Sequence, residues 1–140
     1  MRCEEIMKKD VQFVSPRDTV EDAAIRMKDH DIGFLPVCDQ SRKVLGTLTD
    51  RDIAIRAVAG KRPSSTFVEE IMTEEVIACR PEDDIQDAQL AMAENHKSRI
   101  ICCDEEGRLL GVISLSDVAE HAPDTASETL RDVSEREART

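Results

Sequence analysis

Cys3-Glu-Glu-Ile-Met7, near the start of the chain, returns as Val68-Glu-Glu-Ile-Met72. The match continues outward, because Glu4–Ala54 lies on Glu69–Ala119 at a constant offset of 65 residues and without a gap. Further identical pairs at this offset are Pro16 and Pro81, Asp22 and Asp87, Met27 and Met92, Cys38 and Cys103, Gly46 and Gly111, and Asp52 and Asp117. A unit this short cannot bury its own apolar face, so the two copies are predicted to pack about a pseudo-twofold axis with two equivalent clefts.

The composition narrows the class of protein. The 140 residues include no Trp or Tyr and only three Phe, so aliphatic residues and Met must fill the core. Few aromatic side chains argue against single-stranded nucleic acid, and the net charge of −11 repels phosphate backbones and anionic membranes. The chain contains no run of about 18 apolar residues and no signal-peptide core, so a cytoplasmic location is expected.

The cysteines number five, an odd total without Cys-x-x-Cys spacing, which does not indicate a disulfide framework. They are Cys3, Cys38, Cys79, Cys102 and Cys103. A cytoplasm keeps thiols reduced, and a free Cys within an apolar stretch usually packs as a small hydrophobe. Cys3, near the terminus, is predicted to be the most reactive of the five.

Each copy predicts the element order β-α-β-β-α, which places the chain in the α/β class, as an α+β fold of two repeats. Apolar, β-branched runs predict strands at 11–14, 34–38 and 44–49 in the first copy and at 76–79, 99–103 and 109–114 in the second. The predicted domains are repeat one at 1–60, a linker at 61–65, repeat two at 66–122 and a polar tail at 123–140. The tail is expected to be solvated, and a dimer contact through Leu130 and Val133 is the alternative.

Capping patterns and apolar spacing predict two helices in each copy. Thr19-x-x-Asp22 has the form of a capping box, and Asp84 caps the equivalent helix of copy two. The predicted buried stripes are Val20, Ala23, Ala24 and Met27 in copy one, and Ile85, Ala88 and Met92 in copy two. A closing helix begins at about Asp50 or Leu115. Its first apolar face in copy one is predicted to comprise Ile53, Ala54, Ala57 and Val58.

The junction between the last strand and the closing helix carries the strongest chemical pattern. It reads Gly46-Thr-Leu-Thr49-Asp-Arg-Asp52 in copy one and Gly111-Val-Ile-Ser114-Leu-Ser-Asp117 in copy two. The glycine lets a ligand or a neighbouring strand approach the backbone. The hydroxyl and the helix N-terminus suit a phosphate, and the carboxylate can accept hydrogen bonds from ribose hydroxyls. The same Ser/Thr-x-x-Asp spacing is also a capping box, so a purely structural role stays open.

These features together resemble a pair of CBS domains, the arrangement called a Bateman module. The resemblance spans about residues 3–121 and rests on the Glu-Glu-Ile-Met starts, the prolines after the first strands, Gly33-Phe-Leu-Pro-Val-Cys-Asp39 and the junctions. Copy one is similar to small free-standing bacterial CBS-pair proteins such as those of mycobacteria. Copy two is similar to the nucleotide-binding repeats of the AMP-activated protein kinase gamma subunit. The family implies regulatory binding of an adenosine compound, such as AMP, ADP or ATP, in clefts between the copies.

Carried onto this chain, the resemblance implies that Asp52 and Asp117 hold ribose hydroxyls. It implies Arg99 as a cation for phosphate, with His96 and Lys97 nearby. The implied phosphate-binding hydroxyls are Thr49, Ser114 and Ser116. The implied adenine walls lie near Val14 and Pro16, Phe34 and Pro36, Cys79 and Pro81, and Arg99 and Ile100.

The two implied sites differ in charge. Copy one has Asp50 where copy two has Leu115, and Phe34 where copy two has Arg99. An extra carboxylate and a missing arginine disfavour a polyphosphate in copy one, although Arg51 offsets part of this. We therefore expect the Asp117 site to bind more tightly.

The histidines are scattered and have no nucleophile signature beside them, so we expect no enzyme, no catalytic residue and no metal or cofactor. The expected partners are an adenosine-type ligand, a second chain in a homodimer and a protein that receives the signal, without nucleic acid or membrane. The alternative is a redox- or metal-responsive interaction module that uses its cysteines and binds no nucleotide. A structural module with vestigial clefts is the third hypothesis.

Overall fold

An antiparallel hairpin lies in each repeat of the computed structural model, which describes residues 1–121 and residue 133. The hairpin strands are β1 (Phe34–Cys38) with β2 (Val44–Thr49), and β4 (Arg99–Cys103) with β5 (Leu109–Ser114). The register is the same in both hairpins, because the first residue of one strand lies opposite the last residue of the other. Four of the six predicted strands are thus confirmed with their bounds.

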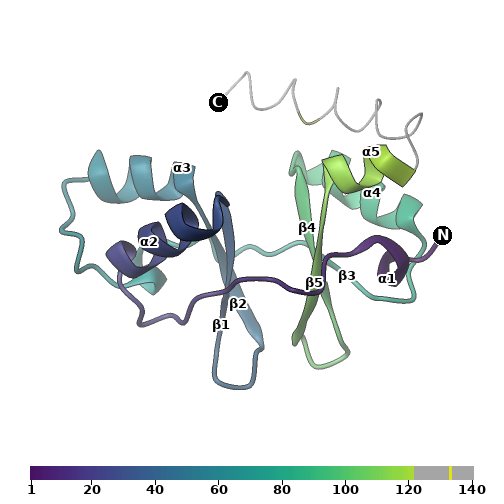
Figure 1. The fold of residues 1–140 in the computed structure, drawn as a ribbon, viewed down its shortest axis with the longest axis horizontal. Helices are drawn as coiled ribbons and strands as arrows, with labels where there is room; N and C mark the ends of the chain where they lie inside the picture. The colour runs from purple at the N-terminus through teal and green to yellow at the C-terminus, as the bar shows by residue number, and fades with distance from the viewer. Residues whose placement is uncertain (122–132, 134–140) are drawn as a thin grey trace. The chain divides into compact units, whose positions relative to one another are not determined.

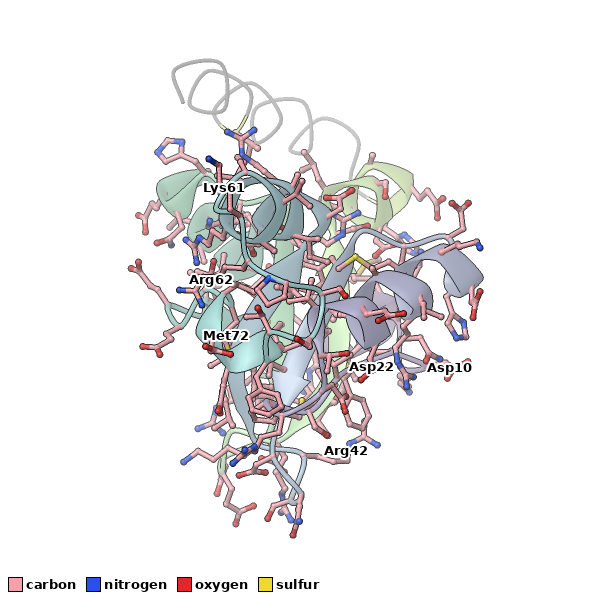
Figure 2. The ribbon with its side chains drawn as sticks, turned by 90° about the vertical axis from the view of Figure 1, so that its left-hand side faces the viewer. Asp10, Asp22, Arg42, Lys61, Arg62 and Met72 are labelled. Carbon is pink, nitrogen blue, oxygen red and sulfur yellow. The ribbon has the colours of Figure 1, made fainter. Side chains whose placement is uncertain are left out.

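The long helices of the two repeats are also equivalent. They are α2 (Val20–His30) and α4 (Ile85–Asn95), with Thr19 and Asp84 as N-caps. Asp22, labelled in Figure 2, lies in the first turn of α2 and completes the predicted capping box. Both helices end at a residue in the left-handed conformation, Asp31 with φ of 52° and His96 with φ of 54°. The predicted buried stripes are confirmed except at Ala24, which is exposed.

The first strand of each repeat is shorter than predicted. Residues 11–14 contribute only an isolated parallel bridge between Val14 and Val37, and the second repeat keeps β3 (Ala78–Cys79). β3 pairs in parallel with β4, so β3, β4 and β5 form a three-stranded sheet. The predicted residues that are absent from the ladder, 11–13 and 76–77, lead into each strand, whereas each strand ends shortly before its proline as predicted.

The closing helices differ between the repeats. In copy two the helix is α5 (Leu115–His121), whereas in copy one a short α3 (Asp50–Asp52) continues as the π-helix η1 (Ile53–Val58). Hydrogen bonds in a π-helix reach the fifth residue, so side chains no longer align at intervals of three and four. The predicted apolar face was therefore wrong for Ala54 and for Val58, which is 72% exposed, and within η1 Ala57 is the buried side chain.

The chain divides into two compact units that do not follow the repeats. Among the described residues, unit 1 comprises Met1–Val11 and residues 77–121, and unit 2 comprises Gln12–Val76. Figure 1 shows α1 (Cys3–Ile6), at the purple end of the chain, with the green elements of unit 1. In the same way η2 (Val68–Glu70), which begins the second repeat, belongs to unit 2. The opening segment of each repeat therefore packs with the hairpin of the other repeat.

Each unit has its own aliphatic core. In unit 1 the core gathers residues of α1, α4, the sheet and α5, and in unit 2 it gathers residues of α2, the hairpin, η1 and η2. No helix within residues 1–121 is both long and apolar enough to cross a bilayer. The contact considered for Leu130 and Val133 lies outside the described residues except for Val133, whose side chain is buried.

Candidate functional site

Two reciprocal hydrogen bonds between Ser114 and Asp117 hold the junction of β5 and α5. The Asp117 backbone N–H donates to Ser114 Oγ at 3.1 Å, and the Ser114 N–H donates to Asp117 Oδ2 at 2.9 Å. Ser114 Oγ also lies 2.8 Å from the hydroxyl of exposed Ser116. The side chain of Asp117 is only 10% exposed. A carboxylate accepts through both oxygens, so Oδ1 keeps capacity for another donor.

Unit 2 repeats this geometry at Thr49 and Asp52. The Asp52 N–H donates to Thr49 Oγ1 at 3.1 Å, and the Thr49 N–H donates to Asp52 Oδ2 at 3.0 Å. The same two bonds, at 3.1 and 3.0 Å, join Thr19 and Asp22 at the start of α2. Capping alone therefore accounts for the pairing at all three helix starts. A ligand role must rest on what else surrounds the carboxylates.

The junction glycines admit a neighbouring segment. A Cβ at Gly111 would lie 2.8 Å from the Lys8 carbonyl oxygen and 2.8 Å from Met7 Sδ. A Cβ at Gly46 would lie 2.7 Å from the Thr73 carbonyl oxygen. Of the two expectations for this glycine, the close approach of another piece of the chain is the one confirmed.

A basic side chain meets each junction carboxylate. Lys8 Nζ lies 3.5 Å from Asp117 Oδ1, and Arg56 Nε lies 3.9 Å from Asp52 Oδ1. Arg56 also donates to the backbone carbonyls of Ile71 and Met72, at 3.1 Å each, whereas the Lys8 side chain is 74% exposed. The cation of unit 1 is therefore freer to turn toward an anionic ligand than the cation of unit 2.

Lys8 and Arg56 were missed by the sequence reasoning. Lys8 lies in the N-terminal segment Met1–Val11 of unit 1, far from Asp117 in the sequence. No local spacing therefore connects the two residues. The repeat offset makes Lys8 equivalent to Thr73, because each residue directly follows a Glu-Glu-Ile-Met segment. This equivalence was the one signal in the sequence for the placement of Lys8.

The predicted site residues divide evenly between the units. Unit 1 holds Cys79, Pro81, Arg99, Ile100, Ser114, Ser116 and Asp117, and unit 2 holds Val14, Pro16, Phe34, Pro36, Thr49, Arg51 and Asp52. The register places Arg99 directly opposite Ser114, and Phe34 directly opposite Thr49. Arg99, Arg51 and Ser116 are exposed, while Ser114, Thr49, Asp52, Phe34, Pro16 and Pro81 are partly buried.

Four of the implied adenine-wall residues lie in the interior. Their side chains are buried, so they pack the units, and only their backbone is left to line a ligand. These residues are Val14, Pro36, Cys79 and Ile100. Within residues 1–121 and at 133, no group of three or more His, Cys, Asp or Glu side chains is arranged to hold a metal ion.

The family follows from comparison with known proteins. The model of the CBS domain matches residues 3–58 and 68–124. The chain therefore belongs to the CBS domain family and carries two copies of the domain, as its resemblance predicted. The α+β fold expected for such a pair is confirmed.

Curated relatives share nearly the whole chain. Protein YlbB of Bacillus subtilis is 33% identical over 141 residues, which cover 99% of this chain and 95% of YlbB. Hypoxic response protein 1 of Mycobacterium tuberculosis is 34% identical over 123 residues, which cover 87% of this chain and 85% of that protein.

Solved structures agree with the fold. The crystal structure of Hypoxic Response Protein I with two coordinated zinc ions has a TM-score of 0.80 and 31% identity, and covers 88% of this chain and 100% of that one. The CBS domain pair of protein MJ0100, in complex with 5'-methylthioadenosine and S-adenosyl-L-methionine, has a TM-score of 0.79. It is 23% identical and covers 89% of this chain and 97% of that one, so its likeness shows the fold alone.

Proposed function

We propose that this chain is a regulatory, non-catalytic CBS-pair protein that binds an adenosine-containing ligand at the Ser114–Asp117 junction of unit 1. The observation that carries the proposal is the buried Asp117 carboxylate, whose Oδ1 faces the exposed Lys8 ammonium at 3.5 Å. Asp22 makes the same two capping hydrogen bonds, but its side chain is exposed, so burial is what distinguishes Asp117 from this helix cap. The complexes of the MJ0100 domain pair with two adenosine compounds support the ligand class.

The chemistry of this junction fits the two polar parts of such a ligand. Asp117 Oδ1 is an acceptor for the ribose hydroxyls, because Oδ2 already accepts from the Ser114 N–H. The exposed Ser116 hydroxyl, Lys8 and Arg99 offer donors to a phosphate, or to the carboxylate of a ligand such as S-adenosylmethionine. We assign the cations to the charged group of the ligand, and Asp117 to its sugar.

The Asp117 site is proposed to be the stronger of two. In unit 2 Arg56 is engaged by two carbonyls, and Asp50 adds a second carboxylate beside Asp52. Both features weaken the attraction for an anionic ligand. Arg51, which is exposed, offsets part of this difference.

The proposal includes a homodimer, a cytoplasmic location and an output through a protein partner. Ile25 on α2 is 48% exposed and Leu90, its repeat equivalent on α4, is 58% exposed. Apolar side chains repeated at one helical position are suited to a symmetric contact with a second chain. None of the five cysteines is in a disulfide, as is usual in a reducing compartment.

A thermal-shift screen tests the ligand class. The purified protein is heated with AMP, ADP, ATP, an adenine dinucleotide and S-adenosylmethionine in turn. A ligand at about 100 times its dissociation constant stabilises by about 2.7 kcal/mol, a shift of several degrees. We expect at least one of these compounds to raise the melting temperature of the wild type clearly more than that of Asp117→Asn. No shift with any of them would contradict the proposal.

A further inference from the structure

Three thiols from distant parts of the chain meet inside unit 1. Cys79, which ends β3, lies directly opposite Cys102 of β4 in the parallel register. The Cys79 thiol interacts with both the Cys102 thiol and the Cys3 thiol of α1. All three are buried, and Cys79 is 6% exposed. Cys3, which was expected to lie at an open terminus, is thus an interior residue.

Unit 2 is an internal control for this cluster. The positions equivalent to Cys3, Cys79 and Cys102 hold three valines in unit 2, Val68, Val14 and Val37. These valines are also buried in one core, and Val14 bridges to Val37 just as Cys79 pairs with Cys102. Valine therefore satisfies the packing at all three positions. By contrast Cys38 and Cys103 are equivalent to each other, so both repeats use that position alike.

We propose that Cys79 and Cys102 are an oxidisable pair, which a hydroperoxide converts to a disulfide across β3 and β4. The proposal does not depend on nucleotide binding. Cys79 and Cys102 are directly opposed on neighbouring strands, whose backbones lie about 4.8 Å apart, and a disulfide joins residues with Cα atoms about 4.4–6.8 Å apart. Valines at the equivalent positions leave unit 2 without such a pair.

The reaction proceeds in two balanced steps. The Cys102 thiolate attacks one oxygen of hydrogen peroxide, the O–O bond breaks, and the hydroxide that leaves takes up a proton to become water. Cys102 is then a sulfenic acid. The Cys79 sulfur attacks the Cys102 sulfur, forms the S–S bond and displaces a second water. Two thiols are oxidised in total, and one peroxide is reduced to two waters.

The electrostatics of the cluster support these roles. The interaction with Cys79 lowers the pKa of the Cys102 thiol, while the contacts with Cys102 and Cys3 raise the pKa of Cys79. The thiolate is the reactive form, so Cys102 is the attacking group and Cys79 the resolving group. Access comes through α1, a helix of four residues whose local opening uncovers Cys3 and the thiols beneath it.

Peptide mapping of oxidised protein tests the pair. The full chain is treated with hydrogen peroxide, unfolded, alkylated and digested with trypsin without reduction. Cleavage is blocked before Pro63 and Pro81, so residues 62–97 carry Cys79 and residues 100–108 carry Cys102 and Cys103. We expect these two peptides to be linked, and Cys79 and Cys102 to lose alkylation together and in equal proportion.

Single variants decide which thiols are linked. The link should persist in Cys103→Ser and in Cys3→Val, and should disappear in Cys102→Val. Valine is the residue that unit 2 uses at the positions of Cys3 and Cys102, so these variants are designed to keep the core filled. A link through Cys3 or Cys103, or oxidation beyond sulfenic acid without any link, overturns the proposal. The wild-type map and Cys103→Ser decide this even where a valine variant fails to fold.

Discussion

Replacing Gly111 by alanine tests the exchange of segments between the repeats. The new Cβ would lie 2.8 Å from the carbonyl oxygen of Lys8, closer than real Cβ contacts allow. Lys8 cannot retreat freely, because its N–H donates to the Val112 carbonyl at 2.9 Å and its own carbonyl accepts from the Val112 N–H at 3.0 Å. We therefore expect the Met7–Lys8 segment to be pushed off the edge of β5.

The expected change in the free energy of unfolding is the difference between two opposed effects. Overpacking costs about 1–3 kcal/mol, and a weakened backbone hydrogen bond adds about 1 kcal/mol. Alanine also lowers the conformational entropy of the unfolded chain, which stabilises the folded protein by about 0.4–1 kcal/mol. The net loss in free energy of unfolding is about 2 kcal/mol, or roughly 6 °C in melting temperature for a chain of this size.

The assay is thermal unfolding followed by circular dichroism, with Gly33→Ala as the matched control. A Cβ at Gly33 would lie 2.7 Å from Oδ2 of Asp50, an exposed side chain that can rotate away. The control should therefore stay within about 0.5 kcal/mol of the wild type. Equal melting temperatures for Gly111→Ala and Gly33→Ala would refute the reasoning that the N-terminal segment runs over Gly111.

Two further predictions concern pH and assembly. Burial raises the pKa of the Cys103 thiol from 9.0 to about 11. The unfolded chain therefore ionises this thiol first, and stability falls by about 1–3 kcal/mol as the pH rises from about 9 to about 11. Melting curves across this range should show a smaller alkaline loss in Cys103→Ser, and an unchanged loss would contradict the assignment. Ile25→Glu combined with Leu90→Glu should convert a dimer to a monomer by light scattering, because it places charge on the exposed apolar positions of α2 and α4. A wild type that is already monomeric, or a charged variant that stays dimeric, would count against the proposed contact.

Local signals in the sequence predicted the elements that depend on neighbouring residues. The hairpins follow from β-branched runs around polar turns, and α2 follows from the Thr19–Asp22 capping box and its apolar stripe. Because the two copies align at one offset, each element was predicted in both copies, and the prediction for the second copy could be compared with that for the first. This is why the bounds of the hairpin strands and the starts of the helices could be predicted in both copies.

Features that depend on distant residues could not be predicted in this way. The placement of Lys8 beside Asp117 and of Cys3 beside Cys79 results from the exchange of opening segments, which no local pattern encodes. The π-helix η1 has the apolar spacing of an ordinary helix, so its exposed Val58 was unforeseen. The capping box was ambiguous from the start, because caps and ligand sites use the same hydroxyl and carboxylate.

Calorimetric titration of S-adenosylmethionine and of AMP into three matched asparagine variants tests the central claim most directly. Asp117→Asn, Asp52→Asn and Asp22→Asn each replace the carboxylate of a capping box with the same two bonds, and the amide can still accept from the cap N–H. A hydrogen bond to a charged group contributes about 1.5–3 kcal/mol, so Asp117→Asn should weaken binding by about 10- to 100-fold. Asp52→Asn should weaken it less, and Asp22→Asn should leave it unchanged. No measurable binding to the wild type, or equal losses in Asp117→Asn and Asp22→Asn, would reduce the Asp117 junction to a helix cap.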